Sequence, residues 1–248
     1  MDAAIPMKDA TMSFWDHVAE LRWRLLVAAL ALVAGTIACF FFVEPAAAFI
    51  IRPVGDMQFV FLSPPELFMS YVKLALIGGI VIASPVILFQ LWLFVRPGLS
   101  RRERVSLVFG LFFGAIFFIG GAAFSFFVII PFSLRFFLQY QNESVKAMFS
   151  FSEYVSFIGS MVLSFGAAFE LPIVVSILAG LGVVTGTALA KARGVSILLI
   201  FIAAAILTPP DVLSQILLGV PMVALFELSI ILAKGQEKRR ARTLDLEA

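Results

Sequence analysis

Six apolar runs divide the chain, and they constrain its fold more than any other feature of the sequence. Each run holds at most one charged residue, and five of them have the ~20 residues that an α-helix needs to cross the hydrocarbon core of a bilayer. The runs occupy residues 23–43, 67–95, 105–130, 154–181, 195–207 and 212–233. With 62% hydrophobic and 14% charged residues, the chain also lies far outside the composition of soluble domains. The sequence therefore predicts an all-α integral membrane protein with six transmembrane helices.

The distribution of Lys and Arg predicts how these helices are oriented. Fourteen of the 18 basic residues lie in the N-terminal segment, in the joints after the second and fourth runs, or in the C-terminal tail. Because joints with an excess of Lys and Arg face the cytoplasm, both termini are expected to be cytoplasmic. We expect a cytoplasmic segment with an interfacial amphipathic helix over residues 1–22, a six-helix transmembrane domain over 23–233 and a basic cytoplasmic tail over 234–248. The two larger outer loops would then cover residues 44–66 and 131–153.

The fifth run is too short to span a bilayer upright. Its 13 residues make a helix of about 20 Å, whereas the hydrocarbon core is ~30 Å thick. The turn Thr208-Pro209-Pro210-Asp211 separates it from the sixth run. We therefore expect a short final helical hairpin that either thins the membrane locally or is sheltered by protein.

A Ser or Thr three residues before an acidic residue marks five expected helix starts. This is the spacing of a capping box, in which a hydroxyl and a carboxylate satisfy free N–H groups at the start of a helix. At two of these starts a proline, Pro64 or Pro209, occupies the first helical position, which needs no N–H donor. The five pairs are Ser13 and Asp16, Ser63 and Glu66, Ser100 and Glu103, Ser150 and Glu153, and Thr208 and Asp211. Capping alone would explain Glu103, which lies in an arginine-rich joint.

Glu170 lies near the centre of the fourth run, where an ionised side chain costs at least ~2.5–3.5 kcal/mol. Pro172 follows two residues later and cannot donate a hydrogen bond to the carbonyl of Ala168, so we expect the helix to bend there. Together these residues predict a polar site within the membrane. The alternative is a protonated Glu170 that hydrogen-bonds to a neighbouring helix and serves packing alone.

The segment before the first run has two different faces when it is placed on a helix. An apolar stripe repeats at helical spacing, and polar residues follow another face. The stripe consists of Phe14, Val18, Leu21 and Leu25, and the polar face of Ser13, His17, Glu20 and Arg24. We expect an interfacial helix that runs into the first span with its stripe toward the membrane. Glu20 and Arg24 are spaced either for a simple i,i+4 ion pair or for binding a ligand.

Several motifs of enzymes and metal sites are missing from the sequence, which reduces the number of functions that the chain could have. It has no G-x-x-x-x-G-K-[ST] phosphate loop, no G-x-S-x-G elbow, and a single His and a single Cys. We therefore expect no enzyme activity, catalytic residue, cofactor or metal, and the net charge of +2 does not indicate nucleic-acid binding. Gly110 and Gly114 have the spacing of close helix packing, which is more often a contact within one chain than between chains.

A set of short motifs extends over nearly the whole chain. They are Phe14, His17, Glu20-Leu21-Arg22 and Arg24-Leu25; Ser63-Pro64-Pro65-Glu66 with Phe68; Ser84-Pro85-Val86; Arg101-Arg102-Glu103-Arg104; Phe169-Glu170-Leu171-Pro172; and Leu207-Thr208-Pro209-Pro210-Asp211 with Ser214-Gln215. In this order and spacing they resemble the TatC family, the large multispanning subunit of the twin-arginine protein translocase.

The resemblance implies a receptor in a bacterial inner membrane that binds the paired-arginine signal peptides of folded export substrates at the cytoplasmic face. Such a receptor recruits single-span TatA and TatB-type partners, associates with itself in a larger complex and uses the proton-motive force. The implied roles are signal-peptide binding by Phe14, Glu20, Arg22 and Glu103, an intramembrane polar site at Glu170, partner-helix docking at Thr208 and Gln215, and helix-end structure at Pro172, Pro209, Pro210 and Asp211. Carboxylates suit this task because they hold a planar guanidinium through two hydrogen bonds, whereas lysine offers a point charge.

Two other functions stay open on the sequence alone. A proton-coupled secondary transporter would use Glu170 as its proton carrier and would move a small solute without partners. A scaffold without transport activity would assemble with other chains but would not select among signal peptides.

Overall fold

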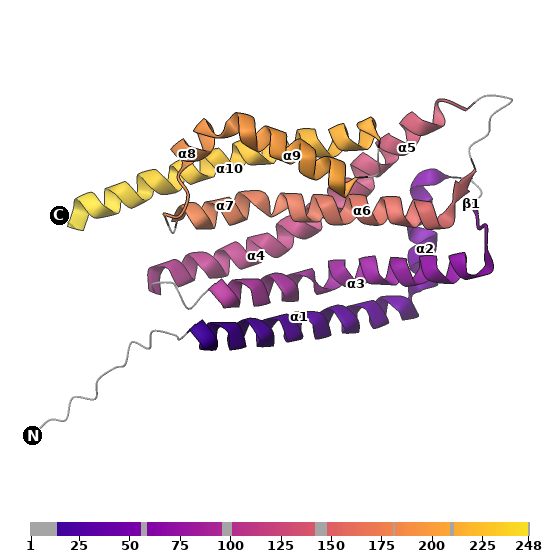
Figure 1. The fold of residues 1–248 in the computed structure, drawn as a ribbon, viewed down its shortest axis with the longest axis horizontal. Coiled ribbons are helices and arrows are strands. Elements are labelled where there is room, and N and C mark those ends of the chain that lie inside the picture. The colour runs from indigo at the N-terminus through magenta and orange to yellow at the C-terminus, as the bar shows by residue number, and fades with distance from the viewer. Residues whose placement is uncertain are drawn as a thin grey trace, which may run out of the picture.

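The computed structural model describes residues 14–55, 59–95, 101–141, 148–180, 182–208 and 211–247. Within them, it does not describe the side chains of residues 14, 16, 54, 95, 101–109, 111 and 239–247. The elements are α1 (Phe14–Phe41), α2 (Val43–Ile51), the 3-10 turn η1 (Arg52–Val54), β1 (Phe59–Val60), α3 (Pro64–Val95), α4 (Arg101–Phe124), the π-helical turn η3 (Ser125–Ile129), α5 (Ile130–Leu138), β2 (Phe149–Ser150), α6 (Phe151–Phe169), α7 (Leu171–Gly180), α8 (Gly186–Lys191), α9 (Arg193–Leu207) and α10 (Val212–Glu247) (Figure 1).

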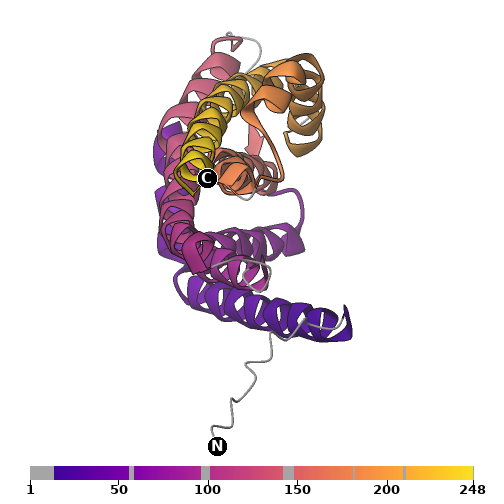
Figure 2. The same ribbon diagram turned by 90° about the vertical axis from the view of Figure 1, so that its left-hand side faces the viewer.

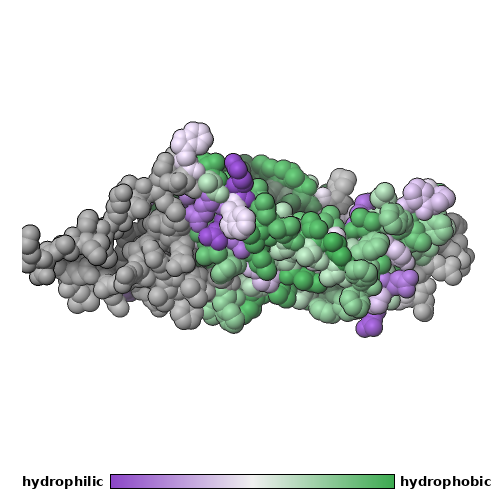
Figure 3. Space-filling view, turned by 90° about the horizontal axis from the view of Figure 1, so that it is seen from below, coloured by the Kyte–Doolittle hydropathy of each residue, from purple (hydrophilic) through white to green (hydrophobic). Residues whose placement is uncertain are grey.

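Five helical segments in the described part of the chain are long and apolar enough to cross a membrane. They are His17–Phe41, Pro64–Phe94, Phe112–Leu138, Phe151–Gly180 and Val212–Lys238. The fifth predicted run forms α9, whose 15 residues give a length of about 22 Å. The prediction of a short helix at this place is therefore confirmed. Figure 3 shows a broad hydrophobic surface over the middle of the molecule, with hydrophilic residues toward its ends.

The long helices run side by side, so the molecule has two ends. Helices α1 and α4 begin, and α10 ends, at one end, which we call the terminal end (Figure 1). The other end, which we call the strand end, carries α2, β1 and the start of α6. Figure 2 shows a curved array in which α1 and α9 lie far apart and α6 and α7 lie inside the curve.

Helices α1 and α3 pack with their backbones close together. A Cβ atom added at Gly79 of α3 would lie 2.5 Å from the Thr36 hydroxyl oxygen of α1, so no side chain fits there. Further along α3, Pro85 cannot donate to the carbonyl of Val81, and the Ser84 hydroxyl donates to that oxygen instead, at 2.8 Å. Because the Ser84 hydroxyl replaces the missing N–H donor, α3 stays helical through an internal proline.

The two predicted outer loops contain structure that the sequence did not indicate. The first holds α2, η1 and β1, and the second holds α5 and β2. Strands β1 and β2 pair in parallel, with Phe59 opposite Phe149 and Val60 opposite Ser150. This short strand pair is not helical, but all the other regular structure in the described residues is, in keeping with the predicted all-α fold class.

Side-chain bonds reinforce the strand end. The Tyr154 hydroxyl at the start of α6 donates to the Ile50 carbonyl of α2 at 2.6 Å. The Ser150 hydroxyl donates to a carboxylate oxygen of Glu66, whose other oxygen accepts from the Leu62 N–H at 2.6 Å. The outer segments therefore tie α2 and α3 to α6.

The five predicted capping boxes have different outcomes. Ser150 caps α6 as expected, because its hydroxyl accepts from the Glu153 N–H at 3.4 Å. The Thr208 and Asp211 box is wrong: Thr208 follows the end of α9, and Asp211 itself caps α10 by accepting from the Ser214 N–H at 2.7 Å. The carboxylate of Glu66 accepts from the Leu62 N–H at 2.6 Å and, more weakly, from the Ser63 N–H, while Ser13, Ser100 and the side chains of Asp16 and Glu103 lie outside the described residues.

Helix α1 is continuous from Phe14 to Phe41, so the expected amphipathic segment and the first span form one helix. At the other terminus, α10 extends past the expected end of the sixth run and continues to Glu247.

Candidate functional site

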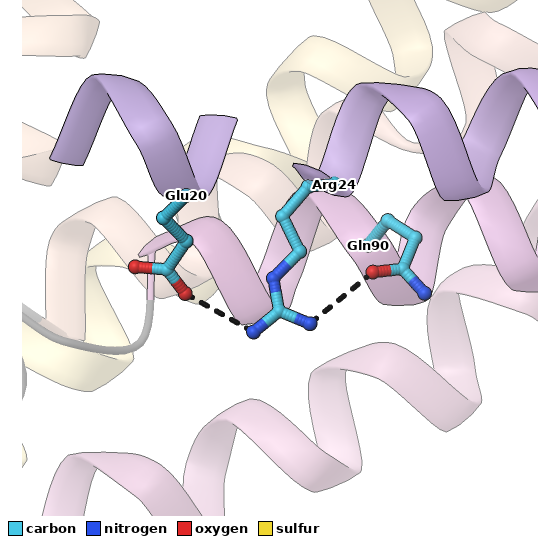
Figure 4. A network of polar contacts seen from close by, with 3 residues as sticks. All are labelled: Glu20, Arg24 and Gln90. Carbon is cyan, nitrogen blue, oxygen red and sulfur yellow. Dashed lines mark hydrogen bonds and ion pairs between the residues drawn. The ribbon is translucent and has the colours of Figure 1, made fainter. Parts of the chain in front are cut away.

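A small polar network joins α1 to α3 near the terminal end (Figure 4). Arg24 forms an ion pair with Glu20, one turn earlier on α1, at 3.0 Å. Its other terminal nitrogen donates to the Gln90 side-chain oxygen of α3 at 3.3 Å. The Glu20 side chain is 15% exposed and that of Arg24 25% exposed, so the pair is partly shielded from solvent. Among the described residues, the buried Glu20 Oε2 and Arg24 Nε have no hydrogen-bond partner, so each can form a further bond.

The ring of His17 extends the same face of α1 toward the terminal end. It stacks on the Phe94 ring of α3, with ring centroids 4.3 Å apart. The apolar stripe points elsewhere, because Val18, Leu21 and Leu25 are exposed. His17, Glu20 and Arg24 therefore face α3, whereas the apolar stripe is exposed. The sequence reasoning missed Gln90 and Phe94; the amide of Gln90, within an apolar run, was a signal that it did not use.

The other predicted signal-peptide residues are less completely placed. Arg22 is exposed on α1, away from the ion pair. Phe14 is the first residue of α1 and Glu103 the third of α4, but both side chains lie outside the described residues. Because α1 and α4 begin at the same end of the molecule, the backbones of Glu20 and Glu103 both lie toward the terminal end (Figure 1).

Glu170 lies where the fourth predicted run is interrupted. Helix α6 ends at Phe169 and α7 begins at Leu171, so the α-helical hydrogen bonding is interrupted next to Pro172, where the sequence predicted a bend. The Glu170 N–H donates to the Ala167 carbonyl at 3.2 Å, three residues back, which tightens the last turn of α6. The residue is only 8% exposed, and within the described part of the chain its carboxylate has no close hydrogen-bond partner beyond a weak contact with the Phe118 N–H of α4. Both the polar-site prediction and the packing alternative therefore stay open.

The glycine pair of α4 makes room for this carboxylate. A Cβ atom at Gly114 would lie 3.1 Å from Oε2 of Glu170, and one at Gly110 would lie 2.7 Å from Cδ1 of Ile177 in α7. The pair therefore serves a contact between α4 and α7 within one chain, as its spacing indicated.

The predicted docking residues of the hairpin form bonds within it. The Thr208 hydroxyl donates to the Ala204 carbonyl at 2.9 Å, and the Gln215 amide donates to the Phe201 carbonyl at 3.1 Å. A partner helix would therefore meet mainly their oxygen atoms as acceptors. Pro209 and Pro210 lie outside the described residues, and Asp211 has the capping role described above.

These features define a multi-pass α-helical membrane protein that carries a carboxylate and guanidinium pair at one end and a buried acid at a break in a helix. Within the described residues, no group of three or more His, Cys, Asp or Glu side chains is placed to hold a metal ion.

The family model described as "Sec-independent protein translocase protein (TatC)" matches residues 16–221. The chain therefore belongs to the TatC family. It is 38% identical over 231 residues to the TatC protein of Carboxydothermus hydrogenoformans, which covers 92% of this chain and 95% of that protein. It is 36% identical over 232 residues to the TatC protein of Desulforapulum autotrophicum, covering 92% of this chain and 86% of the relative.

A solved structure has the same fold. A crystal structure of the twin arginine translocase receptor TatC superimposes with a TM-score of 0.80 at 35% identity, covering 89% of this chain and 99% of the other. The family is a component of a protein translocase, so its membership favours the translocase interpretation over the secondary transporter.

Proposed function

We propose that this chain is the signal-peptide receptor subunit of a twin-arginine translocase in a bacterial inner membrane. In this proposal it spans the membrane six times, with α9 as the short fifth crossing and both termini in the cytoplasm. The similarity to a solved structure named as a translocase receptor and the excess of basic residues in the joints next to the terminal end support it.

The observation that carries the proposal is the hydrogen bonding of the two Glu20 carboxylate oxygens. This carboxylate already holds the guanidinium of Arg24, and its second oxygen is buried without a partner among the described residues. A carboxylate in that state is suited to a further guanidinium, because a charged pair that is partly shielded from water is stronger than an exposed one.

Exchange of arginines is the binding step that this geometry supports. An arginine of the signal peptide takes the place of Arg24 at Glu20, and Gln90 keeps hold of the released guanidinium. A lysine ammonium in the same position lacks the planar pair of donors, so the site favours arginine.

The second peptide arginine is assigned to Glu103, with Arg22 and Phe14 completing the surface around the start of α1. Glu103 belongs to a helix that begins at the same end as α1, which supports a shared role for the two acids (Figure 1). The apolar part of the signal peptide then follows the apolar helices into the bilayer.

Partner helices of the TatA and TatB type are assigned to a second region, formed by Glu170 and the hairpin of α9 and α10. Glu170 offers the free acceptor capacity of its buried carboxyl group to a hydrogen-bond donor, and the oxygens of Thr208 and Gln215 offer acceptors at the hairpin. Such bonds contribute about 0.6–2 kcal/mol each within a membrane, which sets the register of a helix whose packing supplies most of the affinity.

The test measures binding of a fluorescent twin-arginine peptide to the purified protein in nanodiscs, together with its Lys-Lys version. We expect the wild type to prefer Arg-Arg, and Glu20→Gln and Glu103→Gln each to weaken Arg-Arg binding by about tenfold, the loss of one hydrogen bond between charged groups. Glu237→Gln is the matched control, because Glu237 lies on α10 near the terminal end, where its carboxylate accepts from Thr187 at 3.4 Å.

Equal affinity for both peptides in the wild type would overturn the receptor proposal. Unchanged Arg-Arg affinity in both acid variants would remove Glu20 and Glu103 from the site.

A further inference from the structure

A second site is suggested by a cavity at the strand end, far from the Glu20 network. The cavity has a volume of about 590 Å³ and lies between α5, the first half of α6 and the connection from α9 to α10. Phe137, Phe157 and Leu207 are among its apolar walls. Its volume lies within the ~300–1,000 Å³ of typical ligand sites.

The hydroxyl groups in this cavity have already donated their protons to backbone carbonyls. The donations run from Tyr154 to Ile50 at 2.6 Å, from Ser156 to Ser152 at 2.9 Å, from Ser160 to Phe157 at 2.9 Å and from Thr208 to Ala204 at 2.9 Å. Toward a ligand each hydroxyl oxygen can therefore act only as an acceptor, and that of Ser156 already accepts from Lys73. The polar part of the wall is suited to a ligand that donates hydrogen bonds.

Two carboxylates strengthen this preference. Glu153 and Asp211 both line the cavity, one at the start of α6 and the other at the start of α10. One oxygen of Asp211 accepts from the Ser214 N–H, and the Glu153 carboxylate has no hydrogen bond or ion pair within the described residues. The pair leaves the cavity with negative charge available to a cation.

A positive charge lies at the edge of the same cavity. The Lys73 ammonium donates to the Ser156 hydroxyl, which lines the cavity, at 3.2 Å, and to the Ser152 hydroxyl at 3.3 Å. The cavity thus combines acids, a neighbouring ammonium and apolar walls, which matches an amphiphile whose polar head carries both charges.

We propose that this cavity binds the headgroup of an ethanolamine phospholipid. The ligand ammonium donates to Glu153 and Asp211, the phosphate lies toward Lys73, and the first carbons of the chains rest on the aromatic walls. A choline headgroup has the same charges but no N–H donor, and a glycerol headgroup has no cation, so both leave the acceptors unsatisfied. The site is independent of the signal-peptide proposal.

The test uses the full chain, purified in detergent and offered phosphatidylethanolamine, phosphatidylcholine or phosphatidylglycerol with identical acyl chains, with bound lipid counted by native mass spectrometry. We expect the wild type to retain phosphatidylethanolamine about tenfold better than phosphatidylcholine, a difference of the size that one charged hydrogen bond makes. Glu153→Gln and Asp211→Asn should each remove most of that preference. Asparagine still caps a helix, so the second variant keeps the start of α10.

Glu44→Gln is the control, because Glu44 is an exposed acid of α2 that does not line the cavity. Equal retention of the ethanolamine and choline lipids by the wild type would overturn the proposal. So would a preference that Glu153→Gln leaves intact, or one that Glu44→Gln reduces as much as Glu153→Gln does.

Discussion

Two adjacent glycines of α4 allow a controlled test of the packing that supports Glu170. A Cβ atom at Gly121 would lie 2.5 Å from the Phe165 carbonyl oxygen and 2.8 Å from Cγ of Phe169, whereas a Cβ atom at Gly120 would meet nothing within 4 Å. Phe165 and Phe169 belong to the last turns of α6, immediately before Glu170. Gly121→Ala therefore pushes α4 and α6 apart next to the buried acid, and Gly120→Ala adds the same methyl group harmlessly.

The expected magnitudes follow from these contacts. Overpacking costs about 1–3 kcal/mol, and the upper part of this range applies because a backbone oxygen cannot rotate away. Alanine in place of an open helical glycine stabilises by about 0.5–1 kcal/mol. Both variants gain this helix propensity, so they should differ by the overpacking cost alone, about 2–3 kcal/mol in unfolding free energy, or about 4–12 °C in Tm for a chain of this size.

The assay is thermal unfolding of both purified variants and the wild type in the same detergent. We expect Gly121→Ala to melt below the wild type and Gly120→Ala to melt at or above it. Identical midpoints for the two variants would refute the close approach of α4 to α6 at this point.

Two further predictions concern α9 and α10. Gln215→Leu removes the amide bond to the α9 carbonyl and should destabilise the hairpin by about 0.6–1.7 kcal/mol and reduce co-purification of the partner helix; loss of stability with unchanged co-purification would contradict the docking role. Arg193 and Glu227 form two 2.8 Å contacts but are 48% and 38% exposed, so a double-mutant cycle with alanine should give a coupling of only about 0.2–1 kcal/mol, falling with added salt. A coupling above this range at high salt would show that the pair is shielded from solvent.

The sequence predicted the long helices well because their signal is additive. Each long run contains ~20 or more apolar residues, and such a segment forms a helix in a membrane because only a helix satisfies all its backbone hydrogen bonds internally. The break next to Pro172 was equally predictable, since it depends on one missing N–H. The short α9 followed from a count of residues.

Other features depend on residues that are distant in the chain, and local patterns do not encode them. The pairing of Phe59 with Phe149 and the bond from Tyr154 to Ile50 require loops from different parts of the chain to meet. Thr208 was misassigned because its spacing to Asp211 fits a capping box, while the helix start depends on which residue bonds to Ser214.

The candidate site was predicted in part for the same reason. Glu20 and Arg24 are neighbours on one helix, so their contact follows from spacing alone. Gln90 joins them only through the packing of α1 on α3, which periodicity does not reveal. A polar site at Glu170 was predicted from its position in the run, but the space left by Gly114 emerged only from the structure.

The bonds at the strand end also impose an order on assembly during synthesis. Glu66 and Ser150 are 84 residues apart along the chain, and the β1 and β2 strands that lie beside them are similarly separated. Helices α1 and α3 can pack as soon as both have been inserted, but the strand pair must wait until the ribosome has delivered the start of α6. The strand end is therefore completed late in synthesis, and a chain that stops before β2 leaves the hydrogen-bonding edge of β1 unpaired.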